Sequence, residues 1–386
     1  MKYAIAVFVL SVAMTVAARD LRPGPIHYEE PESAPVVTET GFAAWRPDPS
    51  AAMPPDGAAA RWAIAGRTLD WQPSPDPGRG GDAARIPDAA LTDDGSALLL
   101  LETIGTAPGP WATRLLIFSV AAKRIVNMLR LENHRFTALE ELPDDRLLLI
   151  AAGETGTTLS ILELPSGQIL TTRHDLPVIS GHATANGKLW LKEKTTDRIT
   201  IFDLNRQLES IGTITANHPG GSLAVSADGS VLLHFAADPV FYTVVGQPDT
   251  PLPEGVRPAC ALPLDDRAET VLIYAENAPA GLLIRGQVHP IAERAGGTAA
   301  RRGETVFLGL QRQHASALLQ QPPIRGTGLQ NPAPGCRPVT RGEPVRLFCD
   351  PADPRAVFVL DHRANFYRMM PPDRGRRWRK ELLLTP

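Results

Sequence analysis

The sequence feature that most restricts the fold is a short motif that recurs along the chain. Each copy has an apolar lead-in, a turn rich in Asp, Asn or Gly, and then a strand of aliphatic residues. The clear copies are ALTDDGSALLLL at 90–101, LPDDRLLLI at 142–150, TANGKLWL at 184–191 and AVSADGSVLLHF at 224–235. Fainter copies occupy 264–274, 300–310 and 340–349. Such a chain is expected to form a repeat architecture in which each unit packs only on its neighbours.

The spacing of the turns predicts the kind of repeat. The central turn residues are Asp94, Asp145, Asn186, Asp228, Asp266, Arg302 and Gly342. Successive turns are 36 to 51 residues apart, close to the roughly 40 to 45 residues of a four-stranded propeller blade. Further apolar strands follow in the clearest copies, and no helical pattern separates them. We therefore expect an all-β fold, a β-propeller with seven four-stranded blades, while six to eight blades fit the eroded copies.

The repeated unit resembles those of the WD-type and YVTN-type β-propeller families. In those families a strand leads into an Asp-Gly turn, and a second strand follows. The resemblance covers about residues 88–370 and concerns the architecture only, because neither the WD dipeptide nor a Tyr-Val-Thr-Asn copy occurs. It implies a ring of radial sheets and names no ligand.

The first 18 residues have the pattern of a signal peptide. Lys2 precedes an apolar run at 4–16, and the small residues Ala17 and Ala18 follow. This run is shorter than the roughly 20 apolar residues that a membrane-spanning helix needs. We expect cleavage after Ala17 or Ala18 and an exported protein, periplasmic or extracellular.

The segment 19–87 differs from the repeats, because it holds 12 of the 37 prolines. We expect an irregular linker or wrap, with a possible strand near 60–71 that completes the last blade and closes the ring. A ring needs such closure because an unpaired strand edge invites aggregation. The propeller itself is expected to span 88–370.

Residues 371–386 are expected to form a basic C-terminal tail. The run at 374–380 places four arginines and a lysine around Trp378 and could contact an anionic membrane surface. We favour a solvated tail in which Trp378 and the leucines at 382–384 pack outside a blade. The net charge of the chain is −3, which does not indicate a nucleic-acid partner.

The candidate binding residues lie where loops between blades are expected. They are Trp111, His134, His182 and His218. Imidazoles meeting on the propeller axis could bind a metal or transfer protons, but their spacing matches no local ligand motif. We therefore predict no metal, and we expect His182 and His218 nearer the axis than His27, His289 or His314.

The sequence shows no cofactor signature and no nucleophile or phosphate-binding motif. Our leading hypothesis is a non-enzymatic binding or scaffold protein that holds an unknown protein or extended ligand on its loop face. The alternative is a hydrolase of the lactonase or glycan-cleaving kind at the channel mouth, using a carboxylate pair. Its candidate carboxylates are Glu102, Glu154, Glu193, Asp197 and Glu276.

The chain has three cysteines, and export permits a disulfide. A hairpin centred on the turn at 341–344 would place Cys336 opposite Cys349, at a separation close to what a disulfide requires. A one-residue bulge would instead turn one thiol to the other face. Cys260 would be the odd, buried thiol in either case.

Overall fold

The structure is a computed structural model of the 386-residue chain. It describes residues 26–28, 36–38, 41–47, 67–72, 85–104, 112–131, 136–164, 167–226, 228–237, 240–252, 260–265, 269–275, 278–284, 287–292, 295–302, 305–312, 315–321, 344–353, 356–361, 365–370 and 379–384. In this part of the chain, no helix has the length and apolarity that a membrane span requires.

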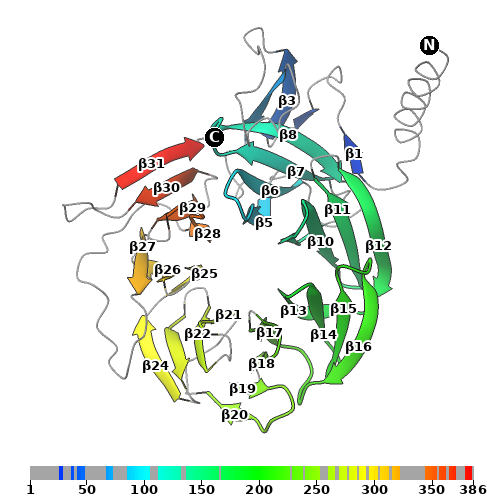
Figure 1. Ribbon diagram of the computed structural model, residues 1–386, viewed down its shortest axis with the longest axis vertical. Helices are drawn as coiled ribbons and strands as arrows, with labels where there is room; N and C mark the ends of the chain where they lie inside the picture. Colours follow the sequence, from blue (N-terminus) through cyan, green and yellow to red (C-terminus); the bar gives the residue numbers. More distant parts are fainter. Residues whose placement is uncertain are drawn as a thin grey trace, which may run out of the picture.

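The described strands form radial antiparallel sheets around a central channel (Figure 1). Blade 1 contains β5(Arg85–Leu91), β6(Ala97–Ile104), β7(Ala112–Ser119) and β8(Arg124–Leu131), and blade 2 contains β9(Ala138–Leu142), β10(Arg146–Ala152), β11(Thr157–Glu163) and β12(Gln168–Leu176). Blade 3 contains β13(Ile179–Ala185), β14(Lys188–Glu193), β15(Arg198–Asp203) and β16(Glu209–Thr215), and blade 4 contains β17(Ser222–Val225), β18(Leu232–Ala237), β19(Val240–Val244) and β20(Thr250–Pro251).

The second half of the ring continues the same order. Blade 5 contains β21(Cys260–Pro263), β22(Thr270–Tyr274), β23(Ala280–Ile284) and β24(Gln287–Ala292). A three-stranded sheet follows, with β25(Ala295–Arg302), β26(Thr305–Arg312) and β27(Ala315–Gln321). The last blade contains β28(Pro344–Cys349), β29(Val357–Asp361), β30(Phe366–Met370) and β31(Arg379–Leu384).

The predicted all-β propeller is confirmed, and its blade count falls within the predicted range. Six radial sheets have at least four strands among the described residues. The sheet β25–β27 has three and occupies the remaining place in the ring. Six complete blades are one fewer than the seven that the turn count favours, because the described part of this copy ends at Gln321, before a fourth strand.

The second strand of each blade is apolar on both faces because it packs between two neighbouring blades. In β6, Leu99 and Leu101 join a cluster shared with blade 2, whereas Leu98 and Leu100 join one shared with the last blade. The outer strands β12 and β16 instead carry many exposed residues. This layering explains why the sequence shows short runs of leucine in place of a strict alternation.

The four clear turns, at Asp94, Asp145, Asn186 and Asp228, occupy equivalent places, each between the first and second strand of its blade. The expected turn at Gly342 lies outside the described residues and comes before β28, the first strand of the last blade. Around Asp94, the Asp94 carboxylate accepts hydrogen bonds from the Thr92 hydroxyl and the Ser96 amide. The Asp228 carboxylate accepts the equivalent two hydrogen bonds, from the Ser226 hydroxyl and the Ser230 amide. Gly95 and Gly229, which follow the two aspartates, have φ of 71° and 74°, a conformation that glycine adopts without strain.

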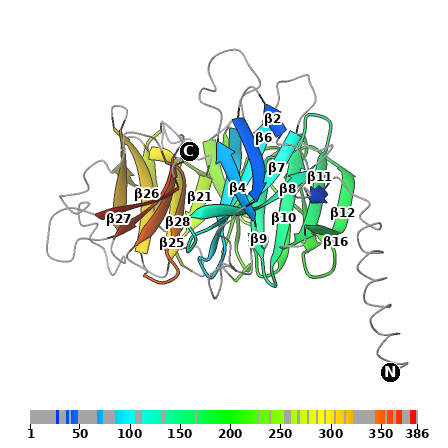
Figure 2. The ribbon, with the colours of Figure 1, turned by 90° about the horizontal axis from the view of Figure 1, so that it is seen from above.

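The ring closes without the strand that was expected near 60–71. Of these residues the structure describes 67–71, which lie in β4(Arg67–Gln72). This strand pairs with β3(Gly41–Pro47), which pairs with β2(Val36–Thr38) in a separate sheet near β8 (Figure 2). All four strands of the last blade come from 344–384, so no place is left for β4. The segment does add one strand to the ring, because β1(Ile26–Tyr28) pairs with β8 at the outer edge of blade 1.

The expected basic tail is in part a blade strand. Residues 379–384 form β31, the outer strand of the last blade, so the propeller extends beyond 370. Leu383 is buried in the cluster between the last blade and blade 1, while Leu382 is exposed. The Lys380 ammonium lies 3.9 Å from the Tyr367 ring centre. Trp378 and the signal-peptide residues lie outside the described part of the chain.

Candidate functional site

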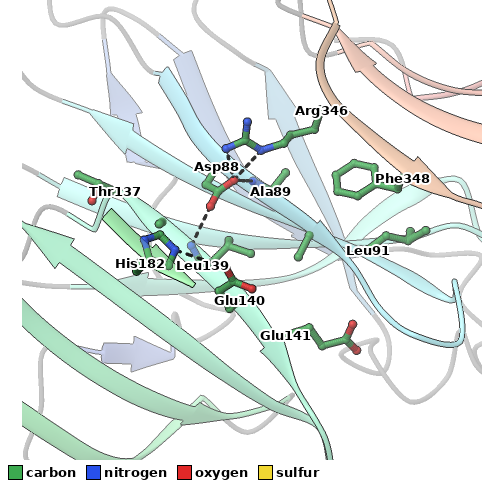
Figure 3. Close-up of a pocket in the computed structure, with 12 residues that line it drawn as sticks. Asp88, Ala89, Leu91, Thr137, Leu139, Glu140, Glu141, His182, Arg346 and Phe348 are labelled. Carbon is green, nitrogen blue, oxygen red and sulfur yellow. Dashed lines mark hydrogen bonds and ion pairs between the residues drawn. The ribbon is translucent and has the colours of Figure 1, made fainter. Parts of the chain in front are cut away.

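A cavity of about 480 Å³ lies in the central channel and is the candidate site (Figure 3). Its walls come from the innermost strands of four blades: β28, β5, β9 and β13. The ionisable residues in the lining are Asp88, Glu140, Glu141, His182 and Arg346. Its volume lies in the range of roughly 300–1,000 Å³ that is usual for ligand pockets.

Asp88 ties three blades together at one wall of the cavity. Its Oδ1 accepts hydrogen bonds from Arg346 Nε at 2.7 Å and from the Ala89 amide at 2.9 Å. Arg346 Nη2 lies 2.6 Å from the same oxygen, and Oδ2 accepts a hydrogen bond from the Leu139 amide at 3.0 Å. Asp88 thereby connects blade 1 to the last blade and to blade 2.

Glu140 and Glu141 extend this polar lining. Glu140 Oε1 lies 3.3 Å from His182 Nε2, and its Oε2 accepts a hydrogen bond from the Thr184 hydroxyl at 3.0 Å. Both contacts cross from blade 2 to blade 3. Glu141 accepts a hydrogen bond from the Asp93 amide in the turn of blade 1. The carboxylates of the cavity are therefore held in place by bonds between blades.

The predicted binding residues do not form one site. His182 lies on β13, the innermost strand of blade 3, and lines the cavity. His218 lies in the loop between β16 and β17 and does not line it. His27 and His289 lie on the outermost strands β1 and β24, as expected for histidines far from the axis. Trp111, His134 and His314 lie outside the described residues.

His218 belongs to a partly exposed polar network on blade 4. Its Nε2 lies 2.7 Å from Asp249 Oδ2, and Asp249 Oδ1 accepts hydrogen bonds from Thr243 Oγ1 at 2.5 Å and Asn217 Nδ2 at 2.6 Å. These bonds, led by that from Thr243, lower the pKa of Asp249 to about 2. The carboxylate is therefore ionised at any physiological pH.

Two basic residues are buried behind this network, at the junction of blades 3 and 4. Lys192 donates from Nζ to the carbonyl oxygens of Glu193 and Thr196. His234 donates from Nε2 to the Gly220 carbonyl at 2.7 Å. Burial lowers the pKa of both side chains, although Asp197 and Glu193 oppose this for Lys192. The loop at 216–221 thus packs over a buried polar junction.

The carboxylates proposed for a hydrolase are not gathered in the cavity. Glu102 is buried and pairs with Arg114 at 2.6 Å inside blade 1. Glu193 accepts a hydrogen bond from the Thr196 hydroxyl in the loop after β14. Glu154 and Asp197 are exposed, and Glu276 lies outside the described residues. Among the residues that the structure describes, no group of three or more His, Cys, Asp or Glu side chains is arranged to hold a metal ion.

The two described cysteines lie on inner strands. Cys260 is half-buried on β21, and its burial raises the pKa of the thiol. Cys349 ends β28 and pairs with Val357 of β29. Cys336 lies outside the described residues, so its disulfide with Cys349 stays a prediction.

Sequence reasoning missed Asp88, Glu140 and Arg346 as cavity residues. A signal was present for two of them, because Asp88, Glu140 and His182 each stand four to six residues before the turn residue of their own blade. A charged residue in the lead-in strand of a repeat indicates a position near the channel, because that strand is the innermost of its blade. Arg346 occupies the corresponding strand of an eroded copy, where the turn could not be aligned securely.

Comparison with known proteins supports the architecture. Neither protein-family profiles nor curated protein sequences give a match. Among solved structures, the WD40 repeats of RRP9 have a TM-score of 0.53 at 14% identity, covering 78% of this chain and 92% of that one. The structure of U3-55K has a TM-score of 0.53 at 14% sequence identity, and the match covers 78% of this chain and 93% of that one. Kuenenia stuttgartiensis hydrazine synthase has a TM-score of 0.56 at 14% sequence identity, and the match covers 77% of this chain and 99% of that one. The chain therefore has the fold of WD40-type propellers, and identities this low show the fold alone.

Proposed function

We propose that this chain is an exported, non-enzymatic β-propeller that acts as a binding or scaffold protein through its loop face. The observation that carries the proposal is a polar network in which the buried Thr243 and mutual hydrogen bonds hold the surface residues Asn217, His218 and Asp249 in one geometry. Side chains already held in place lose little conformational entropy when a partner binds. The partner is a protein or another extended ligand.

The internal bonds of the cavity favour binding over hydrolysis. A glycoside or lactone hydrolase needs a carboxyl group that can exchange a proton with its substrate. Asp88 already accepts bonds from Arg346 and two backbone amides, and Glu140 is engaged by His182 and Thr184. These carboxylates are used to join blades, so we rank the hydrolase as the second hypothesis.

Substitution of the network tests the loop-face proposal. The double change Asn217→Ala and His218→Ala should abolish capture of a specific partner by the purified protein, with chemical cross-linking to mark the contacted residues. Ser210→Ala, an exposed change on the outer strand β16, is the matched control and should leave capture intact. Equal capture by both variants would refute the role of this face. Turnover of a lactone or glycoside that is lost on His182→Ala would establish the hydrolase instead.

Export is tested separately. Cell fractionation should place the protein outside the cytoplasm, and its mature chain should begin at Ala18 or Arg19. Recovery of the full chain with Met1 in the cytoplasm would contradict export and leave the binding proposal standing.

A further inference from the structure

The charge of the channel cavity is unbalanced. Its lining contains three carboxylates, on Asp88, Glu140 and Glu141, against the single guanidinium of Arg346. Partly buried charges such as these are screened by salt less than fully exposed charges are. The cavity therefore attracts cations.

The carboxylates differ in how many hydrogen bonds they already accept. Asp88 accepts four contacts from Arg346, Ala89 and Leu139, which is about the full capacity of a carboxylate. Glu140 has one contact on each oxygen, from His182 and Thr184. Glu140 thus retains acceptor capacity while its position is fixed, and it is the carboxylate that can bind a donor inside the cavity.

The other wall of the cavity is apolar. It is lined by Leu91, Ala90 and Phe348, and Leu91 and Phe348 lie on the far side of Asp88 from His182 (Figure 3). Such a wall suits the methylene stem of a long basic side chain, and an aromatic face also attracts a cation within about 6 Å. A small hydrated metal ion would gain nothing from this wall.

We propose that the channel cavity binds a cation carried on an alkyl chain, a guanidinium or ammonium group such as an arginine or lysine side chain or a free polyamine. The charged head donates hydrogen bonds to Glu140, the charge of Glu141 adds to the attraction, and the stem lies along Leu91 and Phe348. This inference concerns the channel and goes beyond the loop-face function, so either can fail alone.

Binding of small probes to the full-length protein tests the inference. Calorimetry would compare the peptide acetyl-Gly-Gly-Arg-Gly-Gly-amide, its neutral citrulline counterpart, and spermidine. We expect saturable binding of the arginine peptide or of spermidine, at least about tenfold tighter than the citrulline peptide, because a charged hydrogen bond contributes roughly 1.5–3 kcal/mol. Tighter binding of spermidine identifies a free polyamine as the ligand, and tighter binding of the peptide identifies a partner side chain.

Matched variants locate the site. Glu140→Gln keeps the size and shape of the side chain but removes its charge, and should weaken binding about tenfold. Glu141→Gln is a second variant in case the first unfolds. Glu209→Gln, on the exposed outer strand of blade 3, should bind as the unaltered protein does. Equal binding of the citrulline peptide, equal weakening by Glu209→Gln, or no saturable binding of either cationic probe would overturn the proposal.

Discussion

Two blade junctions of this ring are built in different ways. The closing seam, where the last blade meets blade 1, buries eleven residues in one apolar cluster that includes Phe118, Phe358 and Phe366. The junction of blades 3 and 4 buries five, including Trp190. That second junction also encloses Lys192 and His234 and packs the backbone of Gly221 against Phe235.

The two junctions also differ in the path of the chain. Blades 3 and 4 are joined by the short loop at 216–221, so little chain entropy is lost when they dock. The seam joins the two ends of the ring, and no strand crosses it among the described residues. Side chains from the two blades hold it, through this apolar cluster and the Asp88–Arg346 bond.

The largest expected effect is in blade 1, where Glu102 and Arg114 lie on the same strand faces as the seam residues Leu100 and Leu116. Glu102→Ala should lower the free energy of unfolding by about 3–5 kcal/mol, because it leaves Arg114 charged and buried without its counterion. Chemical denaturation measures this loss. The double variant Glu102→Leu and Arg114→Leu should have a free energy of unfolding much closer to that of the unaltered protein, because it removes both charges. A single variant that loses less than about 1 kcal/mol would contradict a buried pair in blade 1.

At the junction of blades 3 and 4, Gly221→Ala should lower the free energy of unfolding by roughly 3 kcal/mol, as measured by chemical denaturation. The added Cβ would lie 2.2 Å from the Phe235 carbonyl oxygen, at a φ of +84°. Gly246→Ala is the control, because Gly246 has a φ of +90° but no atom within 4 Å of the added Cβ. It should lose only about 1 kcal/mol, the cost of the backbone conformation. Equal losses would show that this junction has room to move.

Asp88→Asn should weaken the inner edge of the seam by about 2 kcal/mol, because a charge-assisted bond to Arg346 is lost. A double-mutant cycle with Arg346→Met isolates the interaction energy. Hydrogen exchange should rise first in β28 and β5. A rise confined to β13 and β17 would show that the ring opens at the other junction.

The smallest effect is expected at the outer edge of the seam. Lys123 and Glu381 are 2.8 Å apart but both are exposed, so Lys123→Ala should cost less than about 1 kcal/mol. Thermal unfolding at low and high salt measures it. A loss larger than that of Asp88→Asn would mean that the seam is held at its rim.

Much of the fold could be predicted from sequence because the decisive signals are local. The Thr92–Asp94 and Ser226–Asp228 bonds form within single turns, and the turn of Asn186 and Gly187, both at positive φ, is the usual sequence of a tight hairpin. The assignment of 371–386 as a tail was wrong in part, because the basic residues at 379–380 hid the strand that continues into Leu383.

The candidate site was predictable only in fragments. His182 was identified as a residue of an expected loop between blades, but it lies on the strand β13, and its partner Glu140 lies on another blade. The ring-closing strand was placed on residues that pair with β3 instead. Strand pairing between distant segments depends on which edges are open in the folded ring, and the sequence pattern does not record this.

The sequence by itself determined the repeated blade, its turns and the order of the strands, since each depends on residues close together in the chain. The tertiary structure alone decided which blades carry the cavity and how the ring closes. Asp88 and Arg346 are 258 residues apart, and Lys123 and Glu381 are equally distant. Such pairs meet only after every blade between them has packed, because the position of the last blade is the sum of all the preceding junctions.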